Sequence, residues 1–141
     1  MLRAALIRPL TITALVVCFI VVVLGAYVRL SAAGLGCPDW PGCYGHFSPS
    51  GALDGTTVEA AKAWKEMIHR YAAATLGALI LIIATLAIQT RKTPTVSPGY
   101  ALSLVGLVIL QGILGMLTVT WLLKPVVVTA HLLLGLATLA T

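Results

Sequence analysis

Four long apolar stretches, separated by polar segments, run along the whole chain. They cover about residues 10–28, 68–88, 100–122 and 125–141. Each comes close to the roughly 20 residues that an α-helix needs to cross the hydrocarbon core of a bilayer. We therefore predict an all-α membrane protein: one bundle of four transmembrane helices, forming a single domain over residues 1–141.

The polar segments predict how this bundle is oriented. Arg3 and Arg8 precede the first stretch, and Arg91 and Lys92 lie between the second and the third. Basic residues in short connections stay on the cytoplasmic side, so both termini are expected to be cytoplasmic. The segment of about residues 30–65 carries charges of both signs, and we expect it to form one long outer loop.

Composition supports the membrane interpretation. Only 9% of the 141 residues are charged and 60% are hydrophobic, whereas soluble domains carry about 25% charged residues. The formal net charge of +5 does not indicate nucleic-acid binding, because the basic residues lie between apolar runs and form no basic face. The expected surroundings are a lipid bilayer, with no nucleic-acid partner.

Two cysteines lie in the expected outer loop, within the sequence GCPDWPGCYG at residues 36–45. In the predicted topology Cys37 and Cys43 face an oxidising compartment, so we expect a disulfide between them. A zinc site is less favoured because zinc needs a third and a fourth ligand. A redox-active pair, as in a thiol–disulfide carrier, stays open as an alternative. Cys18, inside the first stretch, is expected to be a free, buried thiol.

Two histidines in apolar stretches are the main candidates for function, because ionisable side chains inside a membrane are costly. We expect His69 in the first turn of its helix and His131 about two turns into its own, at matching depth near the outer end. Small residues on the same faces leave room for a flat cofactor, and haem with two axial histidines is the candidate. These small residues are Ala72, Ala73, Gly77 and Gly135. The alternative is that they only allow helices to pack closely, which is also our interpretation of Gln111, Gly112 and Gly115.

Charged residues beside His69 add further candidates. Glu66 projects from the same helix face as His69 and can handle protons or stabilise positive charge at a cofactor. An interfacial ion pair with Arg70 is the alternative. Arg29 and Arg70 are expected to hold haem propionates, or else to extend towards lipid head groups.

Three segments of the chain resemble the heme A synthase family: GAYVRLSAAGLGCPDWPGCYG at 25–45, EMIHRY at 66–71 and TAHLLLG at 129–135. The resemblance extends over essentially the whole chain. It implies an oxidoreductase that converts the C8 methyl group of heme O into a formyl group, which gives heme A. By motif, His69 and His131 would be the axial haem ligands. Glu66 would be the catalytic carboxylate, and Cys37 and Cys43 the outer cysteine pair.

The chain departs from this family in length. Most members contain two four-helix halves, and this chain resembles only the first. The resemblance thus implies either a homodimer or a separate second half, with heme O synthase and a terminal oxidase as further partners in a bacterial inner or plasma membrane. It implies heme O and heme A as substrate and product, with haem b as the other haem that the site can hold. The last apolar stretch counts about 17 residues from Pro125, near the lower limit for crossing, which favours part of a longer protein. The alternative function is a non-catalytic haem-binding subunit for electron transfer or oxidase assembly.

Overall fold

The computed structural model describes residues 2–49, 57–90 and 97–141, and this part of the chain is built from four α-helices. They are α1 (Leu2–Leu30), α2 (Thr57–Gln89), α3 (Pro98–Thr120) and α4 (Pro125–Ala140). No strand occurs within the described ranges, where extended pairing is limited to one isolated bridge between Cys43 and His46. The predicted all-α class is confirmed.

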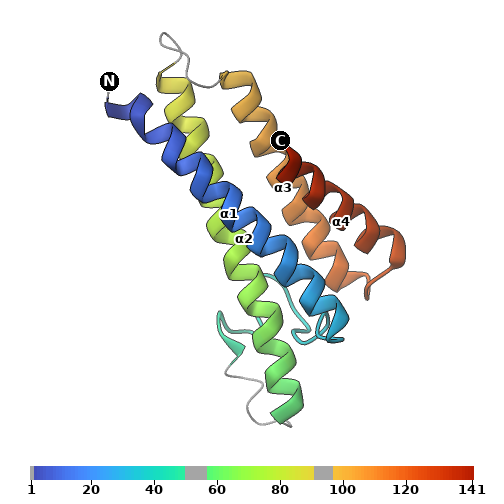
Figure 1. Cartoon of the computed structure of the whole chain (residues 1–141). Coiled ribbons are helices and arrows are strands. Elements are labelled where there is room, and N and C mark those ends of the chain that lie inside the picture. The colour runs from blue at the N-terminus through green and yellow to red at the C-terminus, as the bar shows by residue number, and fades with distance from the viewer. Residues whose placement is uncertain (1, 50–56, 91–96) are drawn as a thin grey trace.

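The helices alternate in direction and close into a ring (Figure 1). α1 and α3 run from the end that holds the N-terminus towards the end that holds the cysteine segment, and α2 and α4 run back. Each helix packs against the next one in sequence, and α4 also packs against α1. α2 and α4 therefore occupy opposite corners of the bundle and run parallel to each other.

Three of the helices, α1, α2 and α3, are long and apolar enough to cross a membrane. α4 has only 16 residues, about 24 Å at the helical rise, against a hydrocarbon core of about 30 Å. The prediction of four spans is thus confirmed for three helices, and α4 is a shorter apolar helix. Large apolar side chains are exposed on the outside of the bundle, for example Phe19, Leu81 and Ile109. This surface suits lipid, and the chain is a multi-pass membrane protein.

α2 begins at Thr57, well before the predicted start near Ile68. Its first three turns contain good helix formers in TVEAAKAWK, with Glu59 at the positive end of the helix dipole. The hydropathy pattern located the apolar part of this helix but not its polar beginning. As a consequence the expected loop of 30–65 overlaps α2, and His69 lies twelve residues into its helix, not in the first turn.

Local sequence determines where α3 and α4 meet. Both helices begin at a proline, Pro98 and Pro125, whose fixed φ suits the first helical position. Between them Leu122 and Leu123 adopt φ values of 51° and 56°, the left-handed region that usually ends a helix. A Cβ on Gly34 would lie 3.3 Å from Leu123, so this turn contacts the segment that follows α1.

The buried core of the described residues consists of three clusters, and the smallest of them, Ala84, Ala87 and Ala101, joins α2 to α3. Ala14, Cys18, Leu76, Ile80 and Ile83 form a buried cluster between α1 and α2, on the side of the N-terminus. Cys18 is a free, buried thiol, as predicted. A second cluster joins the cysteine segment to α2 at the other end of the bundle.

Candidate functional site

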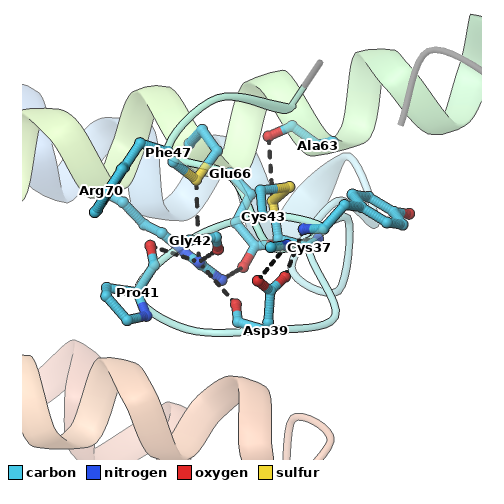
Figure 2. Close-up of a disulfide and its surroundings, with 12 residues drawn as sticks. Cys37, Asp39, Pro41, Gly42, Cys43, Phe47, Ala63, Glu66 and Arg70 are labelled. Carbon is cyan, nitrogen blue, oxygen red and sulfur yellow. Dashed lines mark hydrogen bonds and ion pairs between the residues drawn. A yellow bond between two sulfur atoms is a disulfide. The ribbon is translucent and has the colours of Figure 1, made fainter. Parts of the chain in front are cut away.

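The segment after α1 is closed by a disulfide and lies against α2 (Figure 2). Cys37 and Cys43 are bonded, with their Cα atoms 4.8 Å apart. Both cysteines are fully buried against Ala63 and Met67 of α2. Sulfur atoms in this position are shielded from a partner thiol, which argues against the thiol-carrier interpretation.

Asp39 organises the ring that the disulfide closes. Its carboxylate accepts hydrogen bonds from the backbone N–H groups of Tyr44 at 2.6 Å and Gly45 at 2.9 Å. Partial desolvation raises the pKa of Asp39, but these two donors and the positive charge of Arg70 outweigh it and hold the pKa below its ordinary value. Tyr44 and Gly45 have φ values of 55° and 75°, so the two bonds hold the ring in a tight left-handed turn.

Arg70 attaches this ring to α2. Its Nη1 atom donates to three backbone carbonyls, those of Gly42 at 2.5 Å, Asp39 at 2.9 Å and Pro41 at 3.2 Å. Its Nη2 atom forms an ion pair with Glu66. Figure 2 shows the guanidinium group pointing into the ring. Both terminal nitrogens of Arg70, the residue that we expected to hold haem propionates, thus have partners within the chain.

Glu66 is buried, with 4% of its surface exposed, and both of its carboxylate oxygens have partners. Oε2 accepts the backbone N–H of Cys37 at 3.0 Å, and Oε1 pairs with Arg70. The predicted ion pair therefore exists, but it is buried and extends to the cysteine segment. Glu66 lies three residues before His69 and joins the cysteine segment to the helix that carries this histidine.

His69 packs against α1. A Cβ on Gly25 would lie only 3.0 Å from Cε1 of the imidazole, so the absence of a side chain there lets the ring reach the α1 backbone. The backbone carbonyl of Val21, one turn earlier on α1, accepts a hydrogen bond from the ring. The Nδ1 atom is buried and has no hydrogen-bond partner among the described residues. The donor to Val21 is therefore Nε2, which leaves Nδ1 with a lone pair.

His131 packs against α3 in a similar way. A Cβ on Gly115 would lie 3.6 Å from Cε1 of this ring. Its Nδ1 atom is also buried without a partner in the described part of the chain. The side chain of Gln111, one turn before Gly115, donates to the backbone carbonyl of His131 at 3.0 Å.

The two histidines belong to the same region of the bundle. They lie on α2 and α4, the parallel helices at opposite corners, and their rings are close enough to interact electrostatically. Metal-bound histidines usually donate their second ring nitrogen to a carbonyl or carboxylate, as His69 does to Val21. Within the described residues, no cluster of three or more His, Cys, Asp or Glu could hold a metal ion. Two imidazoles suit haem iron, which needs only two protein ligands.

The remaining sequence candidates are either exposed or packed against a neighbouring helix. Arg29 is exposed at the end of α1. A Cβ on Gly77 would meet Val108 of α3, and one on Gly135 would meet the amide of Gln111. These glycines let helices approach each other, as the packing interpretation predicted. Sequence reasoning missed Gly25 as a contact of His69, because spacing within one helix does not indicate what the facing helix presents.

The sequence of the chain is similar to that of one family of known proteins. The profile of the cytochrome oxidase assembly protein family, COX15-CtaA, matches residues 8–141. A heme A synthase of Shewanella oneidensis is 47% identical over an alignment of 131 residues, which covers 86% of this chain and 39% of that protein. Heme A synthases of Bacillus cereus and Bacillus anthracis are 39% identical over 103 residues, 72% of this chain and 30% of theirs. The chain thus spans well under half the length of these relatives. No solved structure matches it.

Proposed function

Because this chain belongs to the COX15-CtaA family of cytochrome oxidase assembly proteins, we propose that it is the haem-binding half of a heme A synthase. In this proposal His69 and His131 hold the iron of the haem. The reaction is the oxidation of the C8 methyl group of heme O to a formyl group, with oxygen and electrons supplied from outside this chain. Heme O and heme A are then substrate and product, and haem b is the other haem that the site can take.

One observation carries the proposal. Two imidazoles on opposite, parallel helices each keep one buried ring nitrogen without a hydrogen-bond partner in the described part of the chain. An unpaired buried polar atom costs about 1–3 kcal/mol, so two of them in one region call for a ligand. Iron between the two rings would give both lone pairs a partner.

The other residues of the site have separate roles in this proposal. Glu66 is the carboxylate nearest in sequence to His69 and is the candidate for holding or moving a proton at the haem edge. Arg70 donates to the cysteine segment, which makes the exposed Arg29 the better candidate for a propionate group. The disulfide between Cys37 and Cys43 holds the segment that reaches Glu66.

We place the protein in a bacterial plasma or inner membrane with both termini in the cytoplasm. The basic residues before α1 and between α2 and α3 support this orientation. The four helices of the described ranges alternate in direction, so the start of α1 and the end of α4 lie at the same end of the bundle. The cysteine segment would then face outward, where a disulfide persists.

Titration of the purified full chain with protohaem in detergent tests the proposal. We expect one haem per site, with the spectrum of a low-spin, bis-histidine complex. His69→Ala and His131→Ala should each abolish this spectrum, because each removes one of the two histidines that would hold the iron. His46→Ala is the matched control, since His46 lies in the cysteine segment and is exposed. Equal binding by all three variants would refute the assignment of the ligands.

The activity itself needs a second measurement. Co-expression with a source of heme O, followed by pyridine haemochrome analysis, should yield heme A if the chain is active as a homodimer. If heme A appears only when a second four-helix half is supplied, the chain acts with that half. Heme O synthase and a terminal oxidase are the further partners that this reaction requires, upstream and downstream of the chain.

A non-catalytic haem-binding subunit for electron transfer or oxidase assembly is the second candidate. It is favoured by the engagement of both oxygens of Glu66. Stable protohaem binding with no heme A formed under either condition would support it.

A further inference from the structure

A polar side chain of α3 reaches the backbone of the histidine on α4. Gln111 lies in the middle of α3, and its Nε2 atom donates to the backbone carbonyl of His131 at 3.0 Å. An amide in apolar surroundings is costly unless it is hydrogen-bonded. The bond therefore fixes the position of the Gln111 side chain and ties α3 to α4 at the level of His131.

Glycines on both helices make this contact possible. Gly135 lies one turn after His131, and a Cβ there would come within 3.5 Å of the Gln111 amide. Gly115 lies one turn after Gln111 on the same face of α3, under the imidazole of His131. Thus α3 contacts His131 at two points, at its backbone carbonyl and at its ring.

Two such contacts constrain a short helix. α4 has 16 residues, and Val127 is the only one classed as buried within it. The hydrogen bond to the carbonyl sets how far α4 is displaced along α3, and the contact between Gly115 and the ring sets its rotation. Tyr100 of α3 also donates to the backbone carbonyl of Thr141 at the end of α4, so the Gln111 bond is the polar contact between these two helices that lies at the level of His131.

The arrangement on the opposite side of the bundle follows the same spacing. On α1, Val21 supplies a hydrogen-bond partner and Gly25, four residues later, supplies the close approach to His69. On α3, Gln111 and Gly115 stand in the same relation to His131. The difference is that Val21 orients the ring of His69 directly, whereas Gln111 acts on His131 through its backbone.

We propose that Gln111 is a positioning residue, which sets the depth and rotation of His131 through the bond between its side-chain amide and the His131 carbonyl. The effect on haem rests on the function proposed above. The hydrogen bond itself does not depend on that function, so the bond and its effect on haem can be tested separately.

The first test needs no haem. The full chain is labelled with ¹³C at the histidine carbonyls, which gives three signals because the sequence has three histidines. His131→Gln assigns the signal of interest. Gln111→Met keeps the side-chain volume but removes the amide donor, so the His131 carbonyl signal should move. Gly112→Ala is the control, since a Cβ there meets nothing within 4 Å, and should leave the signal in place. An unmoved signal in Gln111→Met would overturn the inference.

The second test uses protohaem. Loss of an outer partner of a metal-bound histidine typically weakens binding about tenfold or more, so we expect at least that increase in the dissociation constant for Gln111→Met. Part of its spectrum should change from low spin to high spin, while Gly112→Ala should match the unmodified protein. If Gln111→Met binds protohaem tightly and in a fully low-spin form, the positioning role is overturned but the proposed function is not. Failure of the unmodified chain to bind protohaem would overturn the proposed function and, with it, any role of Gln111 towards haem.

Discussion

Replacing Gly25 by alanine should displace the imidazole of His69. The added Cβ would lie 3.0 Å from Cε1 and 3.6 Å from both ring nitrogens. Since carbon atoms pack best at about 3.5–4.0 Å, the ring has to retreat by about 0.5–1 Å. Such a movement would weaken the bond to Val21 and shift Nδ1 away from its present position.

The energetic effect can be separated from helix propensity. Overpacking in a filled interior costs about 1–3 kcal/mol, while replacing glycine by alanine within a helix gains up to about 1 kcal/mol. Gly106→Ala on α3 is the matched control, because its Cβ would meet nothing within 4 Å. The two variants share the gain in propensity, so Gly25→Ala should be less stable than the control by about 1–3 kcal/mol.

Thermal unfolding in detergent, combined with protohaem titration, measures both consequences. In a His69→Ala background the Gly25→Ala change should lose its penalty, because the ring that it displaces is absent. In the unmodified background, haem affinity should fall about tenfold or more. The reasoning is refuted if Gly25→Ala behaves as Gly106→Ala does, or if its effect on stability is the same with and without the His69 ring.

Three further predictions concern the cysteine segment. Arg70→Ala should lower the free energy of unfolding by about 3–5 kcal/mol, since Glu66 would keep a buried charge without its cation. An unchanged thermal unfolding transition in this variant would contradict the prediction. The disulfide of Cys37 and Cys43 should resist reduction and alkylation in the folded protein, because both residues are buried. Rapid alkylation of these two cysteines, detected by mass spectrometry, would favour the redox-active alternative. The amide signals of the ring should change only when the pH falls below the ordinary titration range of an aspartate, through the lowered pKa of Asp39, where protonation weakens the acceptor of two N–H bonds. Asp39→Asn should abolish that titration.

The helices could be predicted from the sequence to the extent that hydropathy defines them. The apolar stretches identified all four, because burial in lipid requires continuous apolar surface. The first turns of α2, from Thr57, were assigned to a loop because they are polar, although they contain good helix formers. The limit is physical: hydropathy reports where a helix meets lipid, and a helix that projects into water continues beyond that point.

The candidate site could be predicted only in part. His69, His131 and Glu66 stood out because ionisable residues are rare in apolar helices. The contacts that hold the two rings come from other helices, at Gly25 and Gly115. A single sequence does not reveal such partners, because the spacing within one helix does not indicate the register in which the facing helix packs.

Glu66 connects the two parts of the molecule that the sequence suggested separately. Its oxygens are bonded to the N–H of Cys37 and to Arg70, and Arg70 in turn binds the ring that the disulfide closes. To take up a proton at a haem, one of these oxygens has to leave its partner, which costs about 1–3 kcal/mol for the donor left unpaired. The attachment of the cysteine segment therefore sets how readily Glu66 can act. Replacing either cysteine would therefore lower activity through Glu66, even if the sulfur atoms take no part in the reaction. A redox role can be assigned to the cysteines only by measuring whether their sulfur atoms are oxidised or reduced.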